Sequence, residues 1–303
     1  MKYTFYGAIL YAVKKKVIPV MKYENKCRLD LHVHCDSGDP ALLEQLAETC
    51  RSRKTIACLS GGLRYGGHDF LPNDEVIAIC KKYPDCFLPL AKLDLWETAD
   101  PAEVYHYAEK GVKGFKCIYP YYEYDHDIYM PVYEAAAKCN LPLLFHTGNY
   151  RPSPADELYR RPMLKNMHPI NLDRIARSFQ SLNLVMAHMG TRIFQDEASQ
   201  YIKMLPNLYA DLGGCGQWLR MQPADLAEML KPDTVECDPA MKNFRKLVLG
   251  SDAYVTHPEI VSNGGDHYLR LLKRIGVPKE VIDAVMGKTV ASWMGVELED
   301  AEF

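Results

Sequence analysis

From Cys27 onward, short apolar runs alternate with longer segments in which apolar residues recur every three or four positions. The short runs are typical of buried strands, and the longer segments are typical of amphipathic helices that bury one face. The predicted strands are Arg28–His34, Thr55–Leu59, Cys86–Leu93, Gly114–Ile118, Leu143–Phe145, Leu184–Ala187, Leu208–Leu212 and Leu247–Gly250. The predicted helices are Pro40–Arg53, Glu75–Lys82, a helix from Pro101, Ile128–Cys139, Leu172–Phe179, Glu197–Leu205, His267–Ile275 and Lys279–Met294.

This order predicts the α/β class and, within it, a distorted (β/α)8 TIM barrel with a short N-terminal extension. An open doubly wound sheet is the alternative, but the count of eight strands and the polar residues at their ends favour the barrel. No linker rich in Gly, Pro or Ser divides the chain. We therefore expect residues 1–25 to be an extension and residues 26–303 to form one barrel domain.

The predicted extension contains an apolar stretch, Tyr3–Val13, that is well short of the roughly 20 residues needed to cross a bilayer. We expect no membrane association. The triplet Met21-Lys22-Tyr23 repeats the opening Met1-Lys2-Tyr3, so either methionine could be the start of the chain.

Composition narrows the class of protein further. The 303 residues are 48% hydrophobic and 25% charged, an ordinary globular balance, with a net charge of −3. Without a basic excess, nucleic acid is not an expected partner; a small-molecule substrate is, and a homodimer is a compatible assembly. The ten cysteines include no CxxC pair and several sit in apolar runs, which predicts reduced thiols and a cytoplasmic location.

Histidine or aspartate residues, which can bind a metal, follow or end several of the predicted strands. Strand side chains two apart share a face, so His32 and His34 should both point into the barrel. Three other predicted strands are followed by His146, His188 and Asp252, and the fourth strand carries Lys116 between Phe115 and Cys117. Imidazoles and a carboxylate gathered at one end of a barrel would be costly without a cation, and they are usual ligands of zinc. We predict a divalent metal site there, with zinc as the expected ion.

These residues resemble the amidohydrolase superfamily, and most closely amidohydrolase-related proteins of the aminocarboxymuconate-semialdehyde decarboxylase type. The matching motifs are LDLHVH at residues 29–34, GFK at 114–116, FHTG at 145–148, AHMG at 187–190 and GSD at 250–252. The resemblance extends from about Arg28 to Met294. The C-terminal helix lacks the Asn-Ala pair usual in that family. In the family this pair supports the fold and takes no part in the chemistry.

The resemblance implies one metal ion held by His32, His34, His146 and Asp252. It implies that His188 faces the substrate and acts in proton transfer or polarisation. In two-metal members the corresponding histidine binds a second ion, and a lysine at the position of Lys116 becomes a bridging carbamate. That remains an alternative here; we favour Lys116 as a cationic anchor for a substrate carboxylate.

The expected chemistry starts from a zinc-bound water whose pKa falls to about 7. Asp252 would be both a ligand and the group that accepts the proton of this water, and His188 would stabilise an oxyanion or deliver a proton. Asp30, two residues before His32, would not bind the metal itself but would contact and orient one of the metal ligands.

Candidate substrate contacts come from the loops after the strands. Arg64 and Arg151 could each bind a carboxylate in bidentate fashion, as could Arg192. Four tyrosines after the fourth predicted strand could form a wall for an aromatic or cyclic substrate: Tyr119, Tyr121, Tyr122 and Tyr124.

These features predict a metal-dependent hydrolase that acts on a small, carboxylate-bearing or cyclic substrate through an activated water. The first alternative is a metal-dependent, non-oxidative decarboxylase of the same superfamily, since the same residues serve both reactions. The lesser alternative is a metal-binding barrel without catalysis, and the filled positions argue against it.

Overall fold

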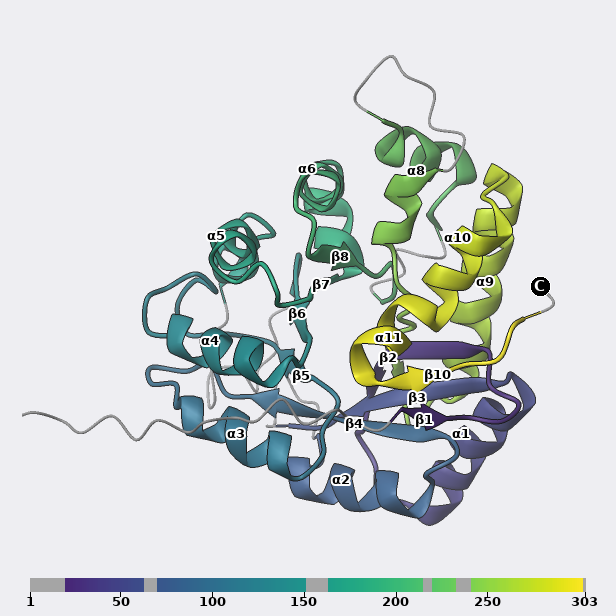
Figure 1. The fold of residues 1–303 in the computed structure, drawn as a ribbon, viewed down its shortest axis with the longest axis horizontal. Helices are drawn as coiled ribbons and strands as arrows, with labels where there is room; N and C mark the ends of the chain where they lie inside the picture. Colours follow the sequence, from purple (N-terminus) through teal and green to yellow (C-terminus); the bar gives the residue numbers. More distant parts are fainter. Residues whose placement is uncertain (1–19, 63–69, 151–162, 215–219, 233–240, 302–303) are drawn as a thin grey trace, which may run out of the picture.

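The structure, a computed structural model, describes residues 20–62, 70–150, 163–214, 220–232 and 241–301. At its centre lies an eight-stranded sheet, parallel throughout, in the order β8-β7-β6-β5-β4-β3-β2-β9 (Figure 1). The strands are β2 (Arg28–His34), β3 (Thr55–Ser60), β4 (Phe87–Leu93), β5 (Phe115–Cys117), β6 (Leu143–His146), β7 (Leu184–Ala187), β8 (Leu208–Ala210) and β9 (Ala253–Tyr254).

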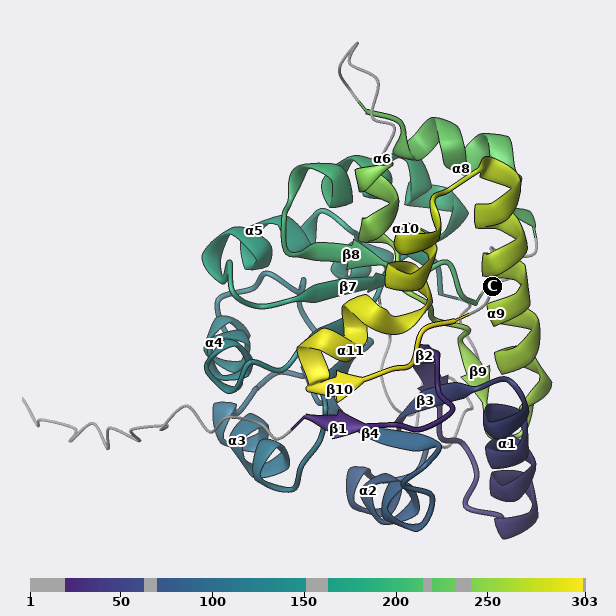
Figure 2. The same cartoon turned by 45° about the vertical axis from the view of Figure 1, so that its right-hand side comes forward.

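Helices surround the outside of this curved sheet, as Figures 1 and 2 show. The helices that alternate with the strands are α1 (Pro40–Ser52), α2 (Asn73–Lys82), α3 (Pro101–Glu109), α4 (Met130–Cys139), α5 (Asn171–Ser178), α6 (Thr191–Met204) and α8 (Pro223–Leu230). The chain then forms α9 (Glu259–Ile275), α10 (Lys279–Asp283) and α11 (Thr289–Met294). This alternation confirms the predicted TIM-barrel architecture.

The predicted eighth strand, Leu247–Gly250, lies between β8 and β2 but is not a regular strand. The Val248 amide donates to the Ala210 carbonyl at 3.0 Å, and the Leu31 amide donates to the Leu249 carbonyl at 2.9 Å. The Leu249 amide, however, donates to Val285 at 2.9 Å, which interrupts the ladder. Regular pairing with β2 resumes at β9, so this segment joins the two edges of the sheet and closes the barrel.

Local sequence explains where several helices start. Asp39 caps α1 by accepting hydrogen bonds from the amides of Ala41 and Leu42, at 2.8 and 3.2 Å, and Pro40 occupies the first turn. Asp100 caps α3 by accepting a hydrogen bond from the amide of Ala102.

The predicted start of the long helix at His267 is wrong. Helix α9 begins at Glu259, and the glycines in its first half do not break it.

The final predicted helix, Lys279–Met294, is divided by a π-helical turn at Ala284–Lys288, where Gly287 has a φ of 155°. A Cβ at Gly287 would lie 2.5 Å from the Leu29 backbone nitrogen. The close approach of this turn to β2 therefore requires a glycine, and it breaks the regular helix.

The amino-terminal halves of the strands meet α11 in an apolar cluster that we call the floor. Its buried strand residues include Leu29, Leu31, Ile56, Cys58, Leu88, Leu90, Leu144, Val185 and Val248, and α11 adds Val290, Ala291 and Met294. Two larger clusters fill the layer between the sheet and its surrounding helices. The interior of the barrel is therefore packed at this end.

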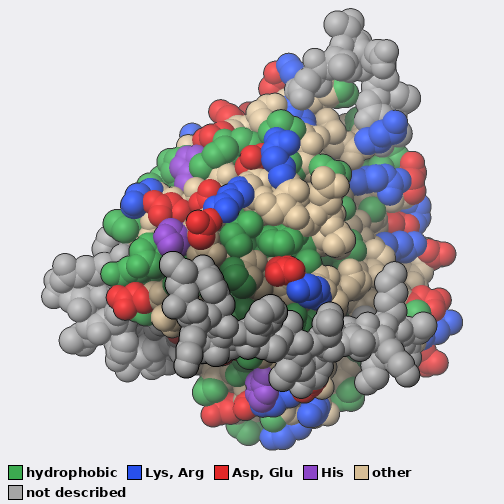
Figure 3. All heavy atoms as spheres, turned by 60° about the vertical axis from the view of Figure 1, so that its left-hand side comes forward, with side chains coloured by type: hydrophobic (Ala, Val, Ile, Leu, Met, Phe, Trp, Pro, Cys, Tyr) green, Lys and Arg blue, Asp and Glu red, His purple; other side chains and the backbone are tan. Residues whose placement is uncertain are grey.

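Part of the predicted extension pairs with the end of the chain. Strand β1 (Met21–Lys22) lies parallel to β10 (Val296–Glu297), next to α11 (Figure 2). None of the described helices is long and apolar enough to cross a membrane. On the face shown in Figure 3, acidic and basic side chains are intermixed rather than gathered by sign.

Candidate metal and catalytic site

The carboxyl ends of the strands carry a group of polar side chains that we call the mouth. Its members are His32 and His34 on β2, Lys92 on β4, Lys116 on β5, His146 on β6, His188 after β7, Asp211 after β8 and Asp252 before β9. All are buried except Asp252, whose side chain is 14% exposed. Buried charged groups are costly unless they are paired, so this concentration points to a functional site.

Three of the four predicted metal ligands lie in direct contact. Nε2 of His32 lies 3.2 Å from Nε2 of His34, and both nitrogens lie close to Oδ1 of Asp252, at 3.1 and 3.0 Å. These atoms form one of the His/Asp groups in the described residues that are compact enough to hold a metal ion.

The tautomer of His32 follows from its other nitrogen. Nδ1 lies 2.9 Å from Oδ2 of Asp211, and a carboxylate can only accept, so we assign the proton to Nδ1. Nε2 then carries the lone pair, 2.7 Å from Nζ of Lys116. Burial, and then the nearby Lys116, lower the pKa of His32 well below its usual value. This histidine is therefore neutral, as a metal ligand must be.

The fourth predicted ligand, His146, contacts His188 rather than the other three. Its Nδ1 lies 3.2 Å from Nε2 of His188, whose own Nδ1 lies 2.6 Å from the carbonyl oxygen of Gly213. Burial, and then His188, lower the pKa of His146 well below its usual value. Nε2 of His146 is buried without a hydrogen-bond partner, which leaves a donor atom open to a cation.

The carboxylate of Asp252 is held ionised by this environment. Burial alone would raise its pKa, but His188 and the hydrogen bond with His34 more than offset that effect and keep the pKa of Asp252 well below its usual value. Gly214 makes room for this arrangement, because a Cβ there would lie 2.1 Å from Oδ2 of Asp252 and 2.7 Å from the His188 ring. Gly214 also has a φ of 69°.

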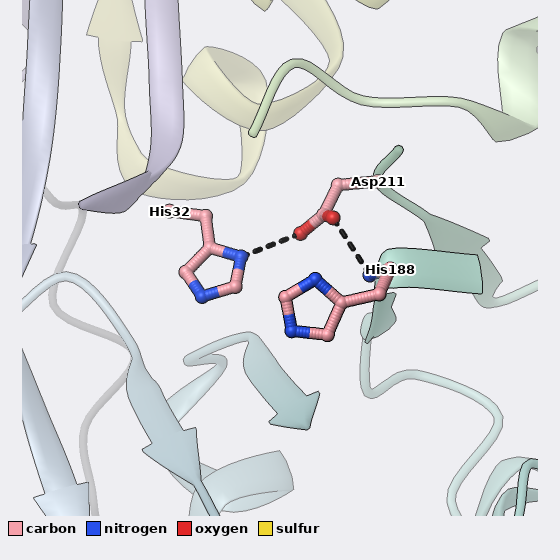
Figure 4. A group of neighbouring side chains, drawn as sticks. All are labelled: His32, His188 and Asp211. Atoms are coloured by element: carbon pink, nitrogen blue, oxygen red, sulfur yellow. Dashed lines mark hydrogen bonds and ion pairs between the residues drawn. The ribbon is translucent and has the colours of Figure 1, made fainter. Parts of the chain in front are cut away.

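Asp211 is a site residue that the sequence analysis missed. It is fully buried, and burial raises its pKa to about 6. Its carboxylate contacts the His32 ring and the main chain of His188 (Figure 4). The signal was present, because Asp211 directly follows β8, but the predicted strand ran to Leu212 and placed this residue inside it.

Lys92 was also missed. It is 3% exposed and is the register partner of Lys116 on the neighbouring strand. Asn73 binds both its backbone amide and its carbonyl, at 2.8 and 3.0 Å. A Cβ on Gly62 would lie 2.1 Å from Cδ of Lys92, so this glycine gives the lysine side chain its space.

Asp30 contacts the backbone of His32 rather than its ring. A register shift between Asp30 and Val33 interrupts the two-residue alternation of side chains along β2. Its Oδ1 accepts hydrogen bonds from the backbone amides of His32 and Ser251, at 3.1 and 3.0 Å. Asp30 therefore binds the backbone on both sides of the mouth, and the contact with an imidazole belongs to Asp211.

Left-handed backbone is concentrated around the mouth. His188, Met189, Thr191 and Asp252 have φ values between 41° and 65°, and Tyr119 has a φ of 52°. Such conformations cost of order 1–3 kcal/mol each for residues with a side chain, and they cluster at functional sites. The surrounding contacts must hold these residues in place.

Aromatic rings flank two of the histidines. His34 stacks on Phe70 and Tyr254, with ring centroids 5.0 and 5.1 Å apart. Tyr119 meets the edge of His146 at 5.5 Å and also contacts Tyr150.

Of the four predicted wall tyrosines, only Tyr119 reaches a mouth histidine through a ring contact. The fully buried Tyr124 instead donates to the Cys117 and His146 carbonyls. Tyr121 and Tyr122 pack against each other, with Trp96 beside Tyr121.

The family model for amidohydrolases matches residues 67–291, about three quarters of the sequence. The chain belongs to the amidohydrolase family. This superfamily is metal-dependent and its members are enzymes, both hydrolases and decarboxylases. A search of curated protein sequences found no match.

Solved structures share the fold of this amidohydrolase at low identity. An uncharacterised TIM-barrel protein from Bordetella bronchiseptica is 14% identical over 91% of this chain and 100% of its own, with a TM-score of 0.64. The 2,6-dihydroxybenzoate decarboxylase from Rhizobium is 15% identical over 92% and 99%, with a TM-score of 0.56. The dihydroorotase from Campylobacter jejuni is 18% identical over 90% and 84%, with a TM-score of 0.56.

The structure describes one of the three predicted arginine contacts, Arg192. Arg64 and Arg151 lie outside the described residues, and Arg192, in the first turn of α6, is exposed. The basic groups of the described mouth are Lys92 and Lys116.

Proposed function

We propose that this amidohydrolase is a metal-dependent hydrolase that acts on a small, carboxylate-bearing or cyclic substrate. The observation that carries the proposal is the contact of His32, His34 and Asp252 through the atoms that would bind a metal. We assign these three residues and the open Nε2 of His146 as the metal ligands.

The donor set fits a single divalent ion of the zinc type, since it consists of three imidazoles and one carboxylate. When bound, the ion would supply a Lewis acid that polarises a substrate oxygen and makes a water molecule more acidic. Asp252 would receive the proton of the attacking water, because its carboxylate is held ionised at the mouth.

His188 would move a proton through Nε2. Its Nδ1 is held by the Gly213 carbonyl at 2.6 Å and keeps its proton there, so Nε2 is the nitrogen that can take up and return a proton. The nearby His146 ring fixes the orientation of the His188 ring.

Lys116 would bind a carboxylate of the substrate. Its ammonium lies 2.7 Å from His32 Nε2, the atom assigned to the metal, so the two cations cannot both occupy this place. With a metal bound, Lys116 would therefore turn toward an anion; a carboxylated Lys116 that serves as a further metal ligand is the alternative. The adjacent Lys92 adds a second positive charge, which supports the first of these two arrangements.

A decarboxylase is the second candidate, and the aromatic rings at the mouth favour it. Phe70 and Tyr254 on His34, and Tyr119 beside His146, would suit a flat aromatic acid. The similar structure from Rhizobium is named for an aromatic acid, 2,6-dihydroxybenzoate. In this reaction His188 would protonate the ring carbon from which carbon dioxide leaves.

Turnover of a substrate panel distinguishes the candidates. Purified full-length protein would be loaded with Zn²⁺ or Mn²⁺ and given lactones, cyclic amides and hydroxylated aromatic acids. We expect acid release from a lactone or amide, lost on chelation and restored by metal. Carbon dioxide release from an aromatic acid would favour the decarboxylase instead. Binding of substrate analogues without turnover would support the non-catalytic barrel.

A further inference from the structure

Asp211 connects two mouth histidines through both of its carboxylate oxygens. Oδ2 accepts a hydrogen bond from Nδ1 of His32 at 2.9 Å. Oδ1 accepts from the backbone amides of His188 and Gly213, at 2.8 and 3.0 Å. Figure 4 shows the Asp211 carboxylate between the His32 ring and the main chain of His188, with an interaction to each.

The contact through Oδ2 selects the tautomer of His32. With the proton held on Nδ1, the lone pair is on Nε2, which faces His34 and Asp252. The other tautomer would place a proton on Nε2, where it would block a cation. A carboxylate hydrogen-bonded to the distal nitrogen of a metal-binding histidine has this orienting effect in general.

The contact through Oδ1 holds a strained stretch of backbone. His188 has a φ of 65°, outside the usual range for a residue with a side chain. The same oxygen binds Gly213, whose carbonyl accepts from Nδ1 of His188. One carboxylate therefore fixes the backbone of His188 and, through Gly213, also the direction of its ring.

We infer that Asp211 is a positioning residue, which fixes the metal-binding tautomer of His32 and the backbone of His188. The inference rests on the proposed metal site. His32, His188 and Asp211 also form a compact His/Asp group, so Asp211 as a metal ligand is the competing assignment. Both of its oxygens face N–H groups in the structure, which favours positioning.

Asp30 offers a matched control. It is another fully buried aspartate, and its Oδ1 accepts from the backbone amides of His32 and Ser251 but contacts none of the described imidazoles. In Asp30→Asn the side-chain carbonyl can still accept both bonds. In Asp211→Asn the amide oxygen can still bind His188 and Gly213, but the NH2 group faces Nδ1 and favours the wrong tautomer of His32.

The test uses the full chain labelled with 15N-histidine, with the His32 signals assigned through His32→Gln. Two-bond 1H–15N spectra of the metal-free protein report which nitrogen carries the proton, and zinc affinity is measured by competition with a chelating indicator. We expect wild type and Asp30→Asn to protonate Nδ1. In Asp211→Asn we expect the proton on Nε2 of His32 and zinc binding roughly 10–100-fold weaker. The ring of His188 should still donate to the Gly213 carbonyl in this variant.

Protonation of Nε2 in wild type would overturn the inference without any variant, even if Asp211→Asn failed to fold. An equal loss of zinc affinity in Asp30→Asn and Asp211→Asn would also overturn it. The loss would then come from removing any buried carboxylate charge, and not from the contact between Asp211 and the His32 ring. If Asp211→Asn kept the Nδ1 proton yet lost zinc, Asp211 would be a ligand. Absence of zinc binding in wild type would contradict the proposed function alone, since the tautomer is read without metal.

Discussion

The mouth and the floor of the barrel are built from the same strands and have opposite chemistry. On β6, Leu144 belongs to the apolar floor, whereas His146 belongs to the mouth two residues later. On the chain through β7, Val185 packs in the floor and His188 contacts the mouth histidines. On these two segments the chain changes from apolar packing to the polar mouth within two or three residues, about 7–10 Å of strand.

The two ends also differ in how well their groups are satisfied. The floor is closed by α11 and contains mostly apolar side chains in contact. The mouth combines left-handed backbone at His188 and Asp252 with a buried nitrogen of His146 that has no partner. Such features lower stability and are retained where a ligand or reaction uses them. We therefore expect the floor to determine stability and the mouth to determine metal binding and turnover.

The largest expected effect is on turnover and comes from His188→Asn. Asn tolerates the left-handed backbone of this position, so the fold should be kept. Turnover should fall by roughly 10²–10⁴-fold, the usual contribution of a positioned proton-transfer group, with bound metal nearly unchanged. Thermal midpoint, metal content and turnover would be measured on one preparation. If turnover of a substrate that the wild type processes were unchanged in the variant, the proposed catalytic role of His188 would be wrong.

The comparison is sharpest on β6, where Leu144→Ala and His146→Ala are two residues apart. Leu144 is 1% exposed, and its truncation should lower the free energy of unfolding by about 2–5 kcal/mol without changing metal affinity. His146→Ala should weaken metal binding and cost less stability, because it also removes a buried nitrogen without a partner. Urea unfolding and metal titration test both. The opposite pattern would contradict the division between floor and mouth.

A smaller effect is expected from Lys116→Met, which removes the proposed carboxylate anchor. Loss of a charge-assisted hydrogen bond to the substrate should raise KM by roughly 10–100-fold, with the metal content still at one ion per chain. Metal analysis and steady-state kinetics on a carboxylate substrate would measure this. Two ions in wild type, with one lost in the variant, would instead show a bridging carbamate.

The smallest effect concerns the titration of Glu103 on α3, a helix outside the sheet; Lys92 of the mouth acts on its pKa only as a minor, lowering influence. Burial, and then the neighbouring Asp94, raise the pKa of Glu103 on α3 to about 7. The folded protein therefore holds the Glu103 proton more tightly than the unfolded chain does. The resulting contribution to the free energy of unfolding is fully present below the unfolded pKa of Glu103 and is lost as the pH rises through 7.

Glu103→Gln should therefore be more stable than wild type at pH 8 by about 1 kcal/mol. This is less than the full pKa shift would give, because solvent screens the partly exposed side chain. At pH 4 the two should be equal. Chemical unfolding at both pH values would check this, with the exposed Glu109→Gln on the same helix as control. A constant difference at both pH values would show that ionisation of Glu103 is not the cause.

The sequence predicts most of this arrangement because strand-end residues in a parallel barrel must meet at one end. That rule predicts that His32, His34, His146, His188 and Asp252 lie together. Applied strictly, it would also have found Asp211, which was hidden by a predicted strand two residues too long.

Other features depend on contacts that a linear pattern does not encode. The register shift in β2 after Asp30 and the interrupted ladder at Leu249 arise from pairing with distant segments. The role of Gly214 is visible only when Asp252 and His188 lie beside it. The buried hydroxyl of Tyr124 was likewise unpredictable, because its two carbonyl partners come from β5 and β6.

The central claim, a metal held at the mouth, is tested most directly by metal analysis of purified full-length wild type and His32→Ala/His34→Ala. Both proteins would be incubated with Zn²⁺, freed of excess ion and compared by mass spectrometry of the metal, with circular dichroism to confirm folding. We predict one ion per chain in wild type and close to none in the double variant, because two of the four ligands are removed. Equal metal in both proteins, or none in either, would contradict the account.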